Sequence, residues 1–157
     1  MSTRSNITVV INEIKELIKG TGDKYLKLIR DPKIKCQLHF HKGNGITRII
    51  TVSEILLQED GSINIHDGRR TYNDTELVKD DAVLLLNAVK QVLEIKTPTE
   101  FCEVINRCQD FPDALHDVIT RNGWEDWSND TDSNLILIDN DRNQTVRLDN
   151  DNIAFVD

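Results

Sequence analysis

The sequence predicts one α+β domain that spans residues 1–157. Two observations predict this class. Apolar residues recur at helical spacing near the N-terminus and again between about residues 78 and 122, and they alternate with polar residues in the segment between these two regions and in the C-terminal part. Hydrophobic residues make up 38% of the chain and charged residues 29%, which is typical of globular proteins. A domain of this length buries roughly 70% of its unfolded surface, so it needs no metal or disulfide to fold.

Two N-terminal helices are expected. Over residues 6–19, apolar side chains recur every three or four positions and charged side chains fill the opposite side. Gly20 can end this helix. A shorter second helix is expected over residues 23–30, and it must stop before Pro32, because the residue before a proline avoids helical geometry.

The pattern changes to that of strands between about residues 33 and 66. Apolar and polar residues alternate over 34–41, and the segment 46–52, rich in Ile, Thr and Val, is expected to pair with this strand. A glycine turn at 59–61 predicts a further hairpin. Residues 53–54 predict either a bulge or one helical turn. We therefore expect an antiparallel meander of three or four strands.

Three helices are expected between about residues 78 and 122, after a polar loop over 67–79. Apolar residues nearly encircle the axis from about 80 to 95, which indicates a central buried helix. The segment 97–100, Thr-Pro-Thr-Glu, matches a capping box with proline at the first helical position, and predicts the start of the next helix. The segment 110–113 is expected to start the third helix.

The C-terminal part returns to strands. The segments 135–138 and 145–148 surround a polar turn and predict a β-hairpin over about residues 135–148. Residues 153–156 are expected to form a last short strand. Residues 128–134 are the one candidate break in the chain, and the residues after it are too few to fold alone.

The polar turn of this hairpin contains Asp139, Asp141 and Asn143 at the spacing that opens an EF-hand calcium loop. That loop requires glycine at its sixth position and glutamate at its twelfth, where this chain has Gln144 and Asn150. An ordinary hairpin turn is therefore expected.

Charge is distributed unevenly along the chain. Residues 109–157 carry twelve carboxylates against three arginines, a net charge of -9, whereas residues 1–108 carry 16 basic and 15 acidic side chains, a net charge of +1. Such a field affects solubility and the choice of partner, but not the fold. We expect the negative charge to form one shared outer surface that meets a basic protein.

The sequence indicates a cytoplasmic protein that binds no cofactor. No run approaches the roughly 18 apolar residues of a membrane span, and the first residues lack the apolar core of a signal peptide. The three cysteines are odd in number and show no CxxC spacing, so they are expected to be free thiols on the apolar sides of their segments.

Three of the four histidines are candidates for a catalytic site. His39 and His41 alternate with apolar residues in the first strand of the expected meander, and His66 has the same phase in the last strand. All three are therefore expected on one face of one small sheet, next to Asp67. Such a group could bind a divalent metal or act as acid and base. Solvated strand histidines, or histidines under a covering helix, are the favoured explanation of the pattern, and no metal site is assigned.

Arg69 and Arg70 follow this group and could hold a phosphate, which would make the chain a small nuclease or phosphodiesterase. The total charge of -8 opposes direct binding of nucleic acid without excluding it. The sequence therefore leaves open whether the protein is an enzyme.

A binding site is expected just after the third of these helices, where two tryptophans enclose two carboxylates. Tryptophan dominates the contacts of many protein interfaces, but it also pins loops onto a hydrophobic core. The expected binding residues are Trp124, Glu125, Asp126, Trp127, Asp130 and Asp132.

The function expected from these observations is non-catalytic binding of a basic partner by the acidic C-terminal part. Immunity proteins, inhibitors of nucleic-acid enzymes and DNA mimics use the same physical principle, since long-range attraction speeds encounter and a few aromatic side chains hold the complex. The alternative is the nuclease or phosphodiesterase that uses His39, His41 and His66.

Overall fold

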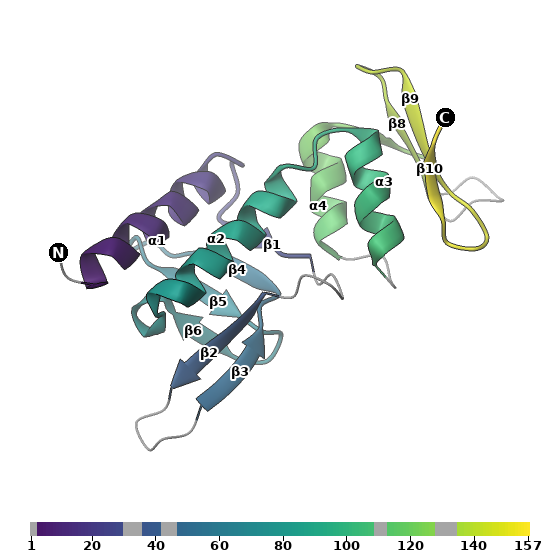
Figure 1. Ribbon diagram of the computed structural model, residues 1–157. Coiled ribbons are helices and arrows are strands. Elements are labelled where there is room, and N and C mark those ends of the chain that lie inside the picture. The colour runs from purple at the N-terminus through teal and green to yellow at the C-terminus, as the bar shows by residue number, and fades with distance from the viewer. Residues whose placement is uncertain (1–2, 30–35, 42–46, 109–112, 128–134) are drawn as a thin grey trace. The chain divides into compact units, whose positions relative to one another are not determined.

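The computed structural model describes residues 3–29, 36–41, 47–108, 113–127 and 135–157, and it confirms the α+β class. The described elements are four α-helices, one short 3-10 helix and ten strands in antiparallel sheets (Figure 1). The chain forms two compact units, residues 1–92 and 93–157, named here the N-terminal and C-terminal units. The single domain expected from the sequence stays a prediction.

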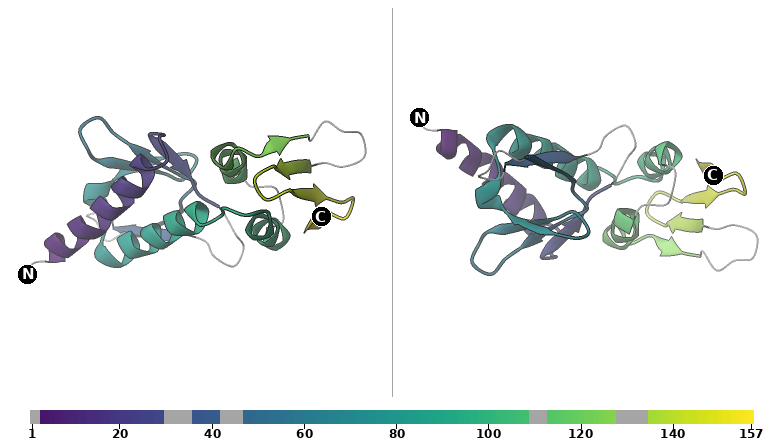
Figure 2. Two further views of the ribbon diagram at one scale, coloured as in Figure 1. Left: turned by 90° about the horizontal axis from the view of Figure 1, so that it is seen from above. Right: turned by 90° about the horizontal axis from the view of Figure 1, so that it is seen from below.

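Two helices form one layer of the N-terminal unit. Helix α1 (Thr3–Lys19) opens the unit and α2 (Lys79–Leu93) ends it, and both lie on the same side of the strands (Figures 1 and 2). On their outer side, Lys90 of α2 forms an ion pair with Glu13 of α1 at 3.4 Å. The buried residues of α1 are spaced by three and four positions, as predicted: Ile7, Ile11, Ile14 and Ile18.

Helix α2 is less buried than the sequence indicates. Leu85 and Val89 are fully buried, but Val83 and Leu84 on the other side are 38% and 48% exposed. The helix is therefore an amphipathic surface helix, and the expectation of a central buried helix is wrong for this face.

A four-stranded sheet lies under these helices, with the strand order β1-β4-β5-β6. Its strands are β1 (Tyr25–Lys27), β4 (Glu54–Leu57), β5 (Ile63–His66) and β6 (Thr71–Asn73). Two expectations are corrected here. The predicted second helix at 23–30 is strand β1, and the predicted loop at 67–79 contains β6 and the 3-10 helix η1 (Asp74–Glu76).

Pairing with β4 explains why residues 25–27 form a strand. Leu26 pairs with Ile55, and Leu26 and Leu28 are buried while their neighbours are partly exposed. This period of two buries the leucines against the sheet, and tertiary pairing of this kind outweighs a weak helical preference.

The other two strands of the expected meander form a separate hairpin, β2 (Gln37–His41) with β3 (Thr47–Thr51). The chain passes from one sheet to the other at residues 52–53. The backbone N–H of Val52 donates to the carbonyl of Cys36 at 3.0 Å, and that of Ser53 donates to the carbonyl of His66 at 2.8 Å. The helical turn considered for residues 53–54 is therefore replaced by this crossing between sheets.

The C-terminal unit has two layers. Helices α3 (Pro98–Arg107) and α4 (Asp113–Asn122) lie on one face of a four-stranded sheet, which Figure 2 shows clearly. The Thr97 hydroxyl accepts a hydrogen bond from the backbone N–H of Glu100 at 3.2 Å, so the predicted N-cap of α3 is confirmed. In the capping box predicted here, the Glu100 carboxylate would accept a hydrogen bond from the backbone N–H of Thr97. It accepts one from the Thr97 hydroxyl instead, at 2.8 Å.

The sheet of this unit has the strand order β10-β9-β8-β7. Its strands are β7 (Glu125–Asp126), β8 (Leu135–Asp139), β9 (Gln144–Leu148) and β10 (Ala154–Val156), so the predicted C-terminal hairpin is confirmed as β8 and β9. The face toward the helices is apolar and buried: Leu135, Leu137, Val146, Leu148 and Ala154.

Two asparagine side chains tie the helices of this unit to neighbouring backbone. Asn106 on α3 is hydrogen-bonded to Ala154 of β10. Asn122, the last residue of α4, donates from its side-chain nitrogen to the carbonyls of Ile95 at 3.1 Å and Val118 at 2.9 Å. In the described part of the chain, none of the helices is both long and apolar enough to cross a membrane.

Candidate functional site

The structure places the predicted histidines in two different sheets. His39 lies on β2, with an exposed side chain, whereas His66 lies on β5 and is partly buried. A His66 ring nitrogen lies 3.0 Å from the Thr71 hydroxyl on β6. His41 ends β2, and its side chain is outside the described part of the structure. The expectation that these histidines share one face of one sheet is therefore corrected.

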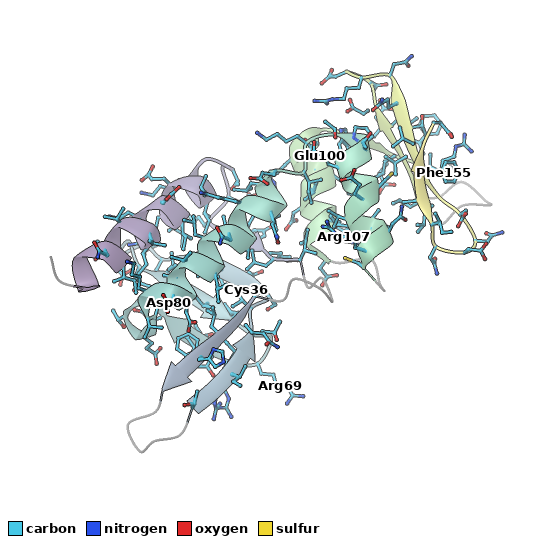
Figure 3. All side chains as sticks on the ribbon, in the orientation of Figure 1. Cys36, Arg69, Asp80, Glu100, Arg107 and Phe155 are labelled. Atoms are coloured by element: carbon cyan, nitrogen blue, oxygen red, sulfur yellow. The ribbon has the colours of Figure 1, made fainter. Side chains whose placement is uncertain are left out.

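Asp67 has a structural task in the turn between β5 and β6. One oxygen of its carboxylate accepts hydrogen bonds from the backbone N–H groups of Arg69 and Arg70, at 2.8 Å and 2.7 Å. The two arginine residues are exposed (Figure 3 labels Arg69). Among the described residues, no three His, Cys, Asp or Glu side chains are grouped so that they could hold a metal ion. The nuclease function stays a prediction without an assembled site.

The two tryptophans, expected together in a binding site, have different environments. Trp124 is 6% exposed, and its ring meets that of Phe101 edge-on with centroids 5.3 Å apart, so it belongs to the core of the C-terminal unit. Trp127 is 54% exposed. Glu125 and Asp126 form β7 and are also exposed, while Asp130 and Asp132 lie outside the described residues.

Trp127 and Glu125 are held together at the edge of the sheet. The indole N–H of Trp127 donates to one oxygen of the Glu125 carboxylate at 3.1 Å, and the side-chain amide of Asn140 donates to the other oxygen at 3.0 Å. The backbone N–H of Trp127 donates to the carbonyl of Ile136 at 2.7 Å. A carboxylate and an exposed indole ring are therefore fixed side by side.

Strand register extends this pair into a surface. Phe155 pairs with Arg147, Arg147 pairs with Ile136, and the register of β7 with β8 places Trp127 opposite Ile136. Side chains of directly paired residues point to the same side of a sheet. These four side chains therefore form one row across all four strands, on the face opposite the helices.

A second row lies beside the first. Glu125 pairs with Ile138, Ile138 pairs with Thr145, and the backbone N–H of Asp157 donates to the carbonyl of Thr145 at 2.8 Å. We call the two rows together the outer face. Its residues are Trp127, Ile136, Arg147, Phe155, Glu125, Ile138, Thr145 and Asp157.

The outer face is open and amphipathic. Phe155 is 41% exposed and lies on the side of the sheet that faces away from α3 (Figure 3). Arg147 is the basic residue of this face, and its guanidinium forms an ion pair with the Asp157 carboxylate. Within the C-terminal unit, no helix or strand among the described residues covers this face. Exposed aromatic rings on an uncovered sheet face are typical of a surface for protein contacts.

The charge asymmetry of the sequence coincides with the division into units. Residues 93–157 contain 15 acidic and 5 basic side chains, a net charge of -10, while residues 1–92 contain 12 acidic and 14 basic side chains, a net charge of +2. The negative potential is therefore a property of one folded unit.

The described carboxylates of this unit differ in exposure. Asp139 is buried inside the β8–β9 turn, where it accepts from the backbone N–H groups of Asp141 and Arg142 and pairs with the Arg142 guanidinium at 3.0 Å. The exposed carboxylates are distributed over helices, strands and turns: Glu94, Glu103, Asp113, Glu125, Asp126, Asp141, Asp151 and Asp157. The expectation that these carboxylates share one outer surface stays a prediction.

Several residues of the outer face were not predicted from the sequence, among them Ile136, Arg147 and Phe155. The run of four apolar residues at 135–138 was a usable signal, because successive residues of a strand point to opposite sides of the sheet and two of the four must therefore lie on each side.

Comparison with known proteins identifies no relative of this chain: no protein-family model, curated protein sequence or solved structure matches it.

Proposed function

We propose that this protein is a non-catalytic binding protein whose C-terminal unit meets a basic partner protein, in the cytoplasm. The observation that carries the proposal is the net charge of -10 on that unit, beside +2 on the other. Opposite charge raises the rate of encounter, from the order of 10⁵–10⁶ M⁻¹s⁻¹ for neutral surfaces up to 10⁸–10⁹ M⁻¹s⁻¹ at low salt.

The amphipathic outer face supports the same function. Electrostatic attraction alone gives little lasting affinity, and stable interfaces depend on a small number of buried aromatic or arginine contacts. Trp127 and Phe155 offer aromatic surface for such contacts at the two edges of the sheet. An acidic unit with an exposed aromatic face is suited to a partner that combines positive charge with apolar side chains.

The test starts with capture of partners from source lysate on the immobilised full chain, at low and high salt. The association rate of each captured protein is then measured with purified components as ionic strength is raised. We expect this rate to fall steeply, because salt screens the attraction between exposed charges over about 10 Å at 0.1 M. A partner whose association rate does not respond to salt would contradict the proposal.

Two double variants with the same change in net charge provide the control. Asp141→Asn with Asp151→Asn removes two exposed charges from the C-terminal unit, and Glu59→Gln with Asp80→Asn removes two from the N-terminal unit. We expect the first variant to slow association several-fold and the second to change it much less. Equal slowing by both variants would show that total charge acts, and not the charge of the C-terminal unit.

A further inference from the structure

We infer that Trp127 and Glu125 form a binding site for an arginine side chain of the basic partner, at the edge of the outer face. This inference rests on the proposed function, because it names the chemistry by which that partner is recognised. It goes beyond net charge, since it assigns recognition to two particular side chains.

The geometry of the pair is the first argument. The Trp127 indole N–H and the Asn140 amide each donate to a different oxygen of the Glu125 carboxylate, at 3.1 Å and 3.0 Å. A carboxylate has about four acceptor positions, so two stay available for a ligand. The carboxylate is thus oriented before any partner arrives, which lowers the entropy lost on binding.

The exposed indole ring is the second argument. Trp127 is 54% exposed, and its backbone N–H donates a hydrogen bond to the carbonyl of Ile136 at 2.7 Å. A cation over the face of an indole ring is attracted by the negative potential of the ring, and tryptophan is the strongest of the aromatic side chains in this respect. The same ring therefore favours a cation that also reaches Glu125.

The two groups together favour arginine over lysine. A guanidinium is planar, stacks on aromatic rings and presents paired N–H donors to a carboxylate, whereas an ammonium is a compact and strongly hydrated charge. Arg147 of the outer face lies on β9 and forms its ion pair with Asp157, which follows β10 at the other edge of the sheet from β7. Ile136 and Phe155 extend the row, so the partner arginine is expected to be accompanied by apolar side chains.

The experiment uses the full ¹⁵N-labelled chain and two defined probes, octa-arginine and octa-lysine peptides. The chain contains two tryptophans, so their side-chain N–H groups give two signals in an NMR spectrum. We expect octa-arginine to shift the signal of exposed Trp127 and to leave that of Trp124, packed on Phe101, in place. Octa-arginine should bind several-fold more tightly than octa-lysine, which carries the same charge.

Matched variants separate this site from general attraction. Glu125→Gln and Glu103→Gln remove the same charge from exposed positions of the same unit, but Glu103 lies on α3. Glu125→Gln is expected to weaken octa-arginine binding about five- to tenfold, and Glu103→Gln by less than about twofold. Trp127→Ala should give a similar loss, with Ile153→Ala as its control because Ile153 is also about half exposed.

The outcomes distinguish the site from the proposed function. Equal losses from Glu125→Gln and Glu103→Gln, or an unmoved Trp127 signal, would overturn the arginine site while salt-dependent binding still supported the proposed function. Salt-independent binding that still requires Glu125 would support the arginine site and contradict the proposed function. If octa-arginine did not bind at low salt, the arginine site and the proposed function would both be contradicted. An unchanged NMR signal from the side-chain N–H of buried Trp124 verifies that each variant is folded.

Discussion

Asn106 on α3 satisfies both backbone hydrogen-bonding groups of Ala154 in the edge strand β10. Its side-chain nitrogen donates to the Ala154 carbonyl at 2.8 Å, and its side-chain oxygen accepts from the Ala154 N–H at 2.6 Å. One amide therefore takes the place of a neighbouring strand at this residue. Edge strands with free N–H and C=O groups invite pairing with other chains, so this contact also protects part of the edge.

Replacing Asn106 with alanine is expected to destabilise the protein by about 1–3 kcal/mol, because Ala154 is buried and would lose partners for both groups. The measurement is the free energy of unfolding in urea. Asn87→Ala is the control, since Asn87 is an exposed helical residue and gains the same helical propensity on substitution. Similar stabilities for both variants would show that the Asn106 contact contributes nothing.

Asp81 is expected to stabilise the N-terminal unit by a contact between layers. It is 6% exposed, and its carboxylate accepts a hydrogen bond from the backbone N–H of His39 on β2 at 2.9 Å. Asp81→Ala would leave this N–H without its acceptor, at an expected cost of about 1–3 kcal/mol in urea unfolding. Asp80→Ala tests the loss of a neighbouring, exposed carboxylate in the same first turn of α2. If both changes cost the same, the helix dipole explains the effect and the contact with His39 does not.

The stability of the protein is expected to fall as pH rises above about 9. Burial raises the pKa of the Cys36 thiol to about 12 and that of the Cys102 thiol to about 11. In the unfolded chain these thiols ionise near their ordinary pKa, so the unfolded state loses protons first and is favoured. Each thiol then lowers the free energy of unfolding by roughly 1.4 kcal/mol per pH unit, up to its folded pKa.

Urea unfolding of the wild type at pH 7, 8.5 and 10 measures this dependence. Below the ordinary pKa of a thiol, neither cysteine should contribute to the pH dependence. A Cys36→Ala, Cys102→Ala variant is expected to be less stable at every pH but to respond less to pH between 8.5 and 10. An unchanged slope in this variant would rule out the two buried thiols as the cause.

The single domain predicted from the sequence implies one cooperative unfolding transition. Both tryptophans lie in the C-terminal unit, so tryptophan fluorescence reports on that unit alone. Circular dichroism at 222 nm also reports on α1 and α2, the longest described helices, which belong almost entirely to the N-terminal unit. We expect the two signals to change at the same urea concentration. Separate midpoints would show that the two compact units unfold as independent domains.

Local sequence signals predicted much of the fold because they depend on neighbouring residues only. The spacing of Ile7, Ile11, Ile14 and Ile18 suffices to indicate α1, and Thr97 marks the start of α3. Residues 73–76 carry a similar signal, because Asn73 and Glu76 form a capping box that starts η1. This part of the predicted loop could therefore have been assigned from the sequence.

Strand pairing between distant segments could not be predicted in the same way. Leu26 fits a helical pattern and a strand pattern equally, and only its pairing with Ile55 decides between them. The division of the meander into two sheets likewise depends on hydrogen bonds of Val52 and Ser53 to residues that are distant in the sequence. The histidine group failed for this reason, since it assumed one continuous sheet.

The candidate site was predicted only in part. The sequence singled out Glu125, Asp126 and Trp127, which the structure places together on an exposed edge, but it could not separate them from Trp124. Gly123 lies between α4 and Trp124 with a φ of 69°, and the chain reversal there brings Trp124 onto Phe101. Which of two nearby tryptophans is buried depends on that turn and on a ring contributed by the preceding helix.

The two hydrogen bonds of Asn122 have a consequence for the chemical ageing of the protein. Asparagine is among the thermolabile residues, and here it precedes glycine, with its side-chain nitrogen held by the carbonyls of Ile95 and Val118. Deamidation would replace that nitrogen by a negatively charged oxygen facing two carbonyl oxygens. Deamidation at Asn122 should therefore loosen the end of α4 from the segment that precedes α3, and peptide mass spectrometry of samples stored in warm buffer would measure its extent at this residue.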